Sequence, residues 1–311
     1  LCTGVRATDD SDLPVYLRGL HWNNVETELR KDLRLSPHVL PLLYDLTLDV
    51  SVLGYDRAQK STYNGFIRIV IKITAPVKEI ELHSFMLSIN QVDMQGWAST
   101  APEPTDLNDG KFTIREDRET IVIPSRRVIL PGEKVVLEIR YNGTARMDGG
   151  GFYESWNQRE NTTAFPYISL QTHCEPTRAR RWFPCFDEPD KKANFRLVVS
   201  HPEDTNAYSN TRILGTSSAN GKRVTEFNHT VPLPTYLLAL AITEQPVVEL
   251  TVDGYEFRGI GFNRENAVKT AVEGLAILRN HSVFDGVPFI PGKTDILVVD
   301  DYSSGAMENP G

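Results

Sequence analysis

A short segment near the end of the sequence combines bare backbone with a carboxylate, two features that suit the binding of a peptide end. Its residues are Gly305, Ala306, Met307, Glu308 and Asn309. Gly305 has no side chain to hold another main chain away, so an extended peptide can pair there by strand addition. The Glu308 carboxylate is a natural partner for a terminal ammonium, which has three donors and no acceptor. The plain alternative is a polar turn after a strand.

The residues before this segment predict the elements that position it. The apolar run Ile296–Val299 predicts a buried or edge strand that leads into it. Further upstream, Asn263–Glu265 opens a helix that we expect to end near Asn280. Its apolar residues at helical spacing are Ala267, Val268, Ala271, Val272, Leu275, Ala276 and Leu278. The order of strand, helix and strand predicts the opening of an α/β domain.

The region from 33 to 245 shows strand periodicity and no convincing helix. Apolar residues alternate with polar ones in several stretches, among them Tyr44–Val52, Ile67–Ile73, Val135–Tyr141 and Phe195–Val199. Turn-forming stretches separate them, which predicts a β-sandwich or a related open sheet. The uniformly apolar run Leu237–Ile242 predicts a strand covered on both faces at a domain junction.

Residues 171–190 carry an unusual density of arginines, aromatic residues, carboxylates and prolines. We expect Arg180 or Arg181 to pair with Asp187 or Glu188 while the aromatic side chains Trp182, Phe183 and Phe186 pack together. Pairs of this kind are usually architecture, so most of the segment is interpreted as a scaffold.

The segment 305–309 resembles the exopeptidase signature of the zinc aminopeptidases of the aminopeptidase N type. In that family it binds peptide backbone and the substrate's α-amine. Residues 183–189 resemble the same family, and Glu175 matches a Glu or Gln that binds the substrate's amine there. The opening stretch 33–46 is also similar. One departure is His173, where the family often has Gln, and this puts the substrate preference in doubt.

The resemblance covers roughly residues 33–311 and implies a mainly β chain. Residues 1–32 are expected to form a leader or stalk, 33–246 a saddle-like β-sandwich domain, and 247–311 the incomplete beginning of a thermolysin-like catalytic domain. The implied parent enzyme is a zinc aminopeptidase that removes single residues from the free N-terminus of peptides. Its C-terminal catalytic and helical domains are expected to lie beyond these 311 residues.

The zinc motif itself is not among these residues. The family holds zinc with His-Glu-x-x-His, whose two histidines face one metal from adjacent turns of a helix. None of the seven histidines lies four residues from another. We therefore expect the 311 residues alone to bind no zinc and to cleave nothing. The alternatives are a non-catalytic relative that binds peptides, or a structural ectodomain.

Composition narrows the setting and the partners. The formal net charge of −8 argues against nucleic-acid binding, and the apolar run near Tyr236 is far too short to span a bilayer. Three cysteines exclude a disulfide scaffold and leave a Cys174–Cys185 bridge open. Glycosylation sequons occur at Asn142, Asn161, Asn228 and Asn280. They favour an extracellular or cell-surface ectodomain, with a type II anchor expected upstream and a homodimer left open.

Overall fold

The computed structural model describes residues 33–50, 60–97, 103–157, 166–285, 292–300, 302 and 305–311. By its contacts the chain divides into two compact units, Leu1–Ser36 and Pro37–Gly311, and the elements below belong to the second. The predicted leader, 1–32, and the sequon residue Asn161 lie outside the described residues. The domain boundary near residue 246 stays a prediction.

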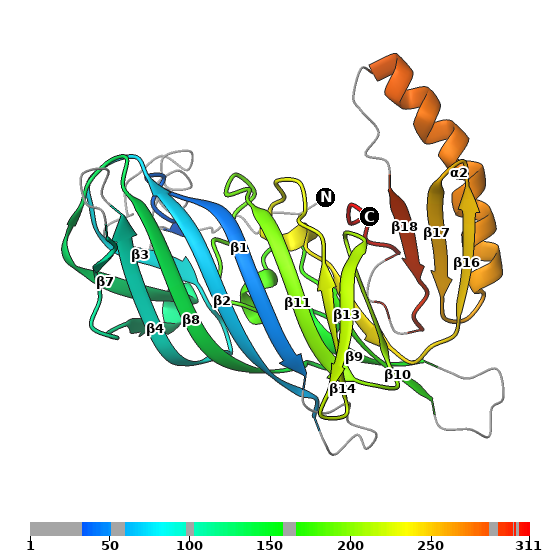
Figure 1. Ribbon diagram of the computed structural model, residues 1–311, viewed down its shortest axis with the longest axis horizontal. Coiled ribbons are helices and arrows are strands. Elements are labelled where there is room, and N and C mark those ends of the chain that lie inside the picture. Colours follow the sequence, from blue (N-terminus) through cyan, green and yellow to red (C-terminus); the bar gives the residue numbers. More distant parts are fainter. Residues whose placement is uncertain are drawn as a thin grey trace, which may run out of the picture. The chain divides into compact units, whose positions relative to one another are not determined.

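Strands dominate the described part of the chain, so the mainly β prediction is confirmed (Figure 1). The largest sheet consists, in spatial order, of β13 (Ile213–Ala219), β14 (Lys222–Phe227), β11 (Asn194–Pro202), β1 (Val39–Val50), β2 (Thr62–Ile73), β8 (Lys134–Thr144), β4 (Ser88–Trp97) and β5 (Thr105–Asp106). A three-stranded sheet contains β3 (Val77–His83), β7 (Thr120–Ile129) and β6 (Thr113–Arg115).

Two further sheets carry the candidate site. One has the order β12 (Asn206–Ser209), β15 (Leu240–Thr243), β10 (Tyr167–His173) and β9 (Gly151–Asn157). The other has the order β16 (Val247–Val252), β17 (Tyr255–Ile260) and β18 (Lys293–Leu297). The described helices are α2 (Arg264–Asp285) and the short 3-10 turns η3 (Glu116–Arg118), η4 (Ala179–Arg181) and η5 (Thr235–Leu237).

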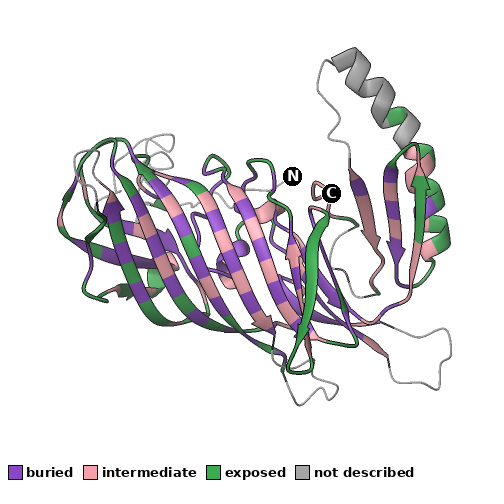
Figure 2. Ribbon diagram, in the orientation of Figure 1, coloured by how far each residue is buried: buried purple, intermediate pink, exposed green. Residues whose placement is uncertain are grey.

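The core of the large sheet follows the alternation in the sequence. Every second residue of β1 from Tyr44 to Val50 is fully buried, and Figure 2 shows this alternation along the neighbouring strands. β1 pairs with β2 in the antiparallel sense and with β11 in the parallel sense, with Leu43 opposite Asn194. Tyr44 stacks on Phe195 of β11 with ring centroids 4.7 Å apart. Burial of alternate apolar side chains therefore fixes the register of the sheet.

Two glycine–tyrosine pairs lock β2 to β8. A Cβ on Gly65 would collide with the ring of Tyr141, and a Cβ on Gly143 would collide with the ring of Tyr63. Both rings are almost completely buried and meet edge to face, with centroids 6.4 Å apart. Each glycine therefore leaves the space that the tyrosine of the other strand occupies.

The helix α2 packs on β17 and begins where the sequence predicts. Val268 lies in a small core with Tyr255 and Phe257, and Gly259 allows the close approach because a Cβ there would meet the Arg264 carbonyl. The helix runs to Asp285, five residues beyond its expected end. The expected end near Asn280 is wrong, because an asparagine only weakly opposes helix propagation.

Two strand predictions need correction. The run Leu237–Ile242 is not one strand, because η5 ends at Leu237 and β15 begins only at Leu240. A side-chain oxygen of Asn210 accepts the Ala239 N–H, which a strand would have donated to its ladder. Within β15 every residue is buried, as expected of a covered strand. The strand predicted at Ile296–Val299 is β18, which ends at Leu297 and forms the edge of its sheet in the described chain.

Candidate functional site

The sheet that contains β10 and β12 brings two loop residues to one edge. Both strands are antiparallel to β15, which lies between them, so they run in the same direction. Leu170 is opposite Ile242, and Ile242 is opposite Ala207, so the strands are level. Adjacent strands lie about 4.8 Å apart, which separates β10 from β12 by roughly 10 Å. Glu175 and Asn210 follow the ends of these strands and therefore leave the same edge of the sheet.

Glu175 lies in a tight turn directly after β10. The turn is closed by a hydrogen bond from the Arg178 N–H to the Cys174 carbonyl, 2.7 Å long. The Glu175–Pro176 peptide bond is cis. The Glu175 side chain is exposed, whereas Cys174 is buried. The carboxylate predicted to bind an amine is thus held on an anchored turn and open to solvent.

The segment 305–311 forms no helix or strand in the structure. Gly305, Ala306 and Glu308 are exposed, while Met307 and Asn309 are half-buried. A Cβ on Gly305 would meet no atom within 4 Å, so another chain can approach its backbone. Pairing of a peptide along Gly305 and Ala306 stays a prediction.

Tyr302 lies beside both carboxylates, and no motif in the sequence marks it. Its hydroxyl is buried and has no hydrogen-bond partner in the described part of the chain. The pKa of the Tyr302 hydroxyl is raised to about 12. The largest cause is burial, followed by electrostatic interactions with Glu308, Cys174 and Glu175. A carboxylate shifts a pKa in this way only when it lies nearby. The structure therefore brings Glu175 and Glu308 to the same hydroxyl, although they are far apart in sequence.

His173, the residue that departs from the family pattern, packs against the ring of Tyr302. Its imidazole lies 4.8 Å from the Tyr302 ring between centroids, with the planes tilted by 41°. The Nδ1 atom lies 3.0 Å from the Gly149 carbonyl oxygen, which fixes the ring orientation when Nδ1 carries the proton. The side chain is nearly buried. Its effect on substrate preference remains a prediction.

A buried polar layer holds the chain just before Tyr302. The Asp300 N–H donates to the Asn157 side-chain oxygen at 2.9 Å. The Asn157 amide donates to the Ser169 hydroxyl, which in turn donates to Thr243, and the Gln245 amide also donates to Ser169. Because each buried polar group loses water, the bonds between them stabilise one arrangement of this loop against the sheet.

The arginine-rich segment is a scaffold, as the sequence predicts. Arg180 pairs with the buried Asp187 through its Nε atom at 3.0 Å, and the Thr235 hydroxyl also donates to Asp187. The pair is not bidentate at the carboxylate, because Nη2 of Arg180 donates to the Asp187 carbonyl instead. Arg181 pairs with Asp148, not with Asp187 or Glu188. The aromatic side chains buried in this segment are Trp182, Phe183 and Phe186.

Both described cysteines are free thiols. Cys174 and Cys185 are buried and unbridged, and burial raises the pKa of each thiol well above its usual value. A neutral buried thiol is a poor nucleophile and a poor metal ligand. The structure therefore shows no Cys174–Cys185 bridge, and Cys174 acts on the site only through its effect on the pKa of Tyr302.

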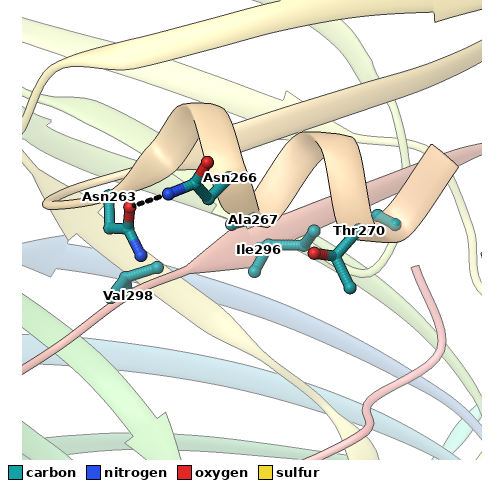
Figure 3. A pocket seen from close by; sticks show the side chains of 7 residues that line it. Asn263, Asn266, Ala267, Thr270, Ile296 and Val298 are labelled. Carbon is teal, nitrogen blue, oxygen red and sulfur yellow. Dashed lines mark hydrogen bonds between the residues drawn. The ribbon is translucent and has the colours of Figure 1, made fainter. Parts of the chain in front are cut away.

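A cavity of about 390 Å³ lies between the first turns of α2 and β18 (Figure 3). Its lining residues are Asn263, Asn266, Ala267, Thr270, Ala271, Ile296 and Val298. Neither Glu175 nor Glu308 lines it. Among the described residues, no cluster of three or more His, Cys, Asp or Glu side chains could hold a metal ion. No described helix is long and apolar enough to cross a bilayer.

Comparison with known proteins relates the chain to one family of peptidases. Residues 40–237 match the model of the Peptidase M1 N-terminal domain. Aminopeptidase Q of Mus musculus is 30% identical over 299 residues, which cover 90% of this chain and 52% of the relative. Aminopeptidase N of Haemonchus contortus is 29% identical over 290 residues, covering 90% and 29%. The chain thus spans about half of the first relative and less than a third of the second.

Proposed function

The chain belongs to the M1 peptidase family, and from this premise we propose that it is the N-terminal part of a zinc aminopeptidase. In this proposal Glu175 and Glu308 bind the free amino terminus of a peptide, and the backbone at Gly305 and Ala306 aligns it. Met307 and Asn309 complete the segment that carries Glu308. The enzyme then releases single residues from the peptide's N-terminus.

The observation that carries the proposal is the shared effect of Glu175 and Glu308 on Tyr302. Both carboxylates raise the pKa of its hydroxyl, and both are exposed. Both negative charges act on one hydroxyl and face solvent, so a cation bound between them would be stabilised. An ammonium group offers three donors to such a pair.

This arrangement also accounts for selectivity toward peptide ends. A peptide with a free N-terminus places its positive charge between the carboxylates. An internal peptide bond carries no charge there, so both carboxylates would lose water without gaining a partner. Specificity then follows from the cost of the wrong ligand as much as from attraction to the right one.

Among the residues that the structure describes, no cluster supplies three ligands for zinc. The histidines of the sequence do not have the spacing of the His-Glu-x-x-His motif. In the proposed enzyme the metal is held by residues other than these 311, and it supplies the activated water for hydrolysis. The part of this chain is to bind the peptide end and to orient the first peptide bond.

Titration with trialanine amide and its N-acetylated form tests the binding proposal directly. We expect the 311-residue chain to bind the free amine and to bind the acetylated peptide at least tenfold more weakly. Glu175→Gln and Glu308→Gln should each weaken binding of the free amine by about 10- to 100-fold, since each removes a charged hydrogen bond. Equal binding of both peptides would overturn the proposal.

A matched control is available on the same sheet. Glu203 is an exposed carboxylate in the turn before β12, at the edge opposite Asn210. Glu203→Gln removes the same charge from the protein, but it should leave peptide binding unchanged. An equal loss in all three variants would show that net charge, not the paired carboxylates, attracts the peptide.

Hydrolysis is tested on the full-length gene product. We expect release of the first residue from trialanine amide, loss of that activity with a zinc chelator, and its recovery with added zinc. Binding of the free amine without hydrolysis under all these conditions would favour a non-catalytic peptide-binding relative.

For location, we propose an extracellular or cell-surface ectodomain with glycans. Asn142 and Asn228 are exposed, as an acceptor must be. The Asn142 amide donates to Asn64 and accepts from Asn90, so glycosylation there would disrupt a cross-strand ladder. The side chain of Asn280 lies outside the described residues. A mass shift on glycosidase treatment of secreted protein, reduced by Asn228→Gln, tests this proposal.

A further inference from the structure

The two residues that follow Glu308 and Asn309, Pro310 and Gly311, are held by hydrogen bonds from the end of β12 and from β18. The Asn210 side-chain amide donates to the Pro310 carbonyl at 2.8 Å. The next carbonyl, that of Gly311, accepts the Asp295 N–H at 3.0 Å and the Lys293 ammonium at 3.1 Å. We name Asn210, Lys293 and Asp295 the clamp.

Asn210 is itself rigidly oriented. Its amide also donates to the Leu237 carbonyl at 2.9 Å, and its oxygen accepts the Ala239 N–H at 2.8 Å. It is nearly buried. A side chain with both ends bonded loses little further freedom when it binds a third group, so the Pro310 carbonyl meets a prepared donor.

The fit around Gly311 adds a steric element. Gly311 has φ near +101°, a conformation that favours glycine, and a Cβ there would overlap the backbone of Asn210. Lys293 is buried beside it and also donates to the Ser209 carbonyl at 2.6 Å and to Asp295 at 2.7 Å. The backbones of Gly311 and Asn210 are therefore in contact, and a larger residue at position 311 would prevent this contact.

The clamp has a direct consequence for the carboxylate pair. Asn210 leaves the same edge of the sheet as Glu175, roughly 10 Å away by the strand spacing. Glu308 precedes Pro310 by two residues, a reach of about 7 Å in extended chain. A fixed Pro310 thus limits how far Glu308 can move from Glu175, and the charges of both reach the Tyr302 hydroxyl.

We propose that Asn210 is a positioning residue, which through the Pro310 carbonyl sets the distance between the Glu308 and Glu175 carboxylates and so the affinity for a peptide's ammonium group. This inference rests on the proposed function for its ligand. Asn210 does not touch the peptide. It acts by holding the segment that carries Glu308, and Lys293 and Asp295 hold the residue after it.

The test uses Asn210→Ala with Thr211→Val as its matched control. The adjacent Thr211 hydroxyl also donates to a backbone carbonyl, that of Asn228, at 2.6 Å, but it has no bond to the clamp. We expect Asn210→Ala to weaken binding of trialanine amide by about 5- to 10-fold, the range of one or two lost hydrogen bonds. Thr211→Val should leave binding within about twofold.

A second measurement separates positioning from loss of stability. The pKa of Tyr302 reports the nearness of Glu308 without any peptide, and it can be followed by NMR of ring-labelled tyrosine. Asn210→Ala should lower this pKa below its value of about 12 as Glu308 moves away. Thr211→Val should leave it unchanged, even where the two variants lose equal thermal stability.

The outcomes distinguish the two proposals. If Glu308→Gln weakens peptide binding but Asn210→Ala changes neither binding nor the Tyr302 pKa, the positioning inference is wrong and the proposed function stands. If Asn210→Ala lowers the pKa while neither Asn210→Ala nor the carboxylate variants alter peptide binding, the clamp holds Glu308 but the amine-binding proposal fails. Equal effects of Asn210→Ala and Thr211→Val on both measurements would also overturn the inference.

Discussion

The ring of Tyr302 packs on the imidazole of His173, with centroids 4.8 Å apart and planes tilted by 41°. This contact joins the loop after β18 to the end of β10. It holds the Tyr302 hydroxyl where the charges of Glu175 and Glu308 both reach it. Tyr302 can therefore report on the state of the two carboxylates.

We expect Glu308→Gln to lower the pKa of Tyr302 from about 12 toward its ordinary value of 10. A neighbouring negative charge disfavours the tyrosinate, so neutralising that charge makes ionisation easier. Glu175→Gln should lower the pKa by a smaller amount, because its effect is the weaker of the two. NMR titration of ring-labelled tyrosine measures both. An unchanged pKa in both variants would show that the carboxylates lie too far from the hydroxyl to matter.

The buried pair Arg180–Asp187 should contribute far more to stability than an exposed pair. Asp187→Asn removes the buried carboxylate partner of Arg180 and, among the described residues, leaves its guanidinium group only the more exposed Glu119, 3.1 Å away, so we expect a loss of about 3 kcal/mol in the free energy of unfolding. The pair Arg68–Glu138 is largely solvent-exposed, and Glu138→Gln should cost about 1 kcal/mol or less. Denaturant unfolding compares the two variants. Similar losses would contradict the assignment of the arginine-rich segment as a scaffold.

The glycine–tyrosine pairs of β2 and β8 predict a steric effect that depends on position. Gly65→Ala and Gly143→Ala should each destabilise the fold by about 1–3 kcal/mol, because the added methyl group collides with a buried ring. Gly215 lies in β13, where a Cβ would meet nothing within 4 Å. Gly215→Ala should change stability by about 0.5 kcal/mol or less. Denaturant unfolding measures the stability of all three variants. A large loss of stability in Gly215→Ala would contradict the steric explanation.

His201 predicts a defined loss of stability in mild acid. Burial lowers the pKa of this imidazole from 6.5 to about 4, and its two nitrogens lie within hydrogen-bond distance of Thr205 and Thr225. Between these pH values His201 is protonated in the unfolded chain and neutral in the folded chain. Stability therefore falls as the pH drops from about 6.5 to 4. His201→Gln should flatten this part of the profile. An equally steep profile in the variant would assign the acid sensitivity to other groups.

The sequence predicts those parts of the fold that depend on local pattern. Alternation from Tyr44 to Val50 locates β1, because a strand with one buried face needs an apolar residue at every second position. The start of α2 at Arg264 is also predicted by a local pattern, the apolar residues at helical spacing that follow it. The parallel pairing of β1 with β11 is not predictable, since no local signal relates Leu43 to Asn194.

The site follows the same division. The carboxylates Glu175 and Glu308 stand out in the sequence through their surrounding motifs. Tyr302 and Asn210 do not, because an aromatic residue after a strand and an asparagine in a turn are both ordinary. Their importance comes from partners far away in the chain, such as Pro310, which lies 100 residues beyond Asn210. Only the folded arrangement shows these contacts.

The parallel pairing of β1 with β11 has a consequence for how the chain folds during its synthesis on the ribosome. Asp45 and Arg196 face each other across this pairing and are separated by 151 residues. At about 5–20 residues per second, one side of β1 waits on the order of ten seconds for its neighbour to be synthesised. During that time its unpaired edge is open to wrong partners, which makes the nascent chain a natural client for chaperones.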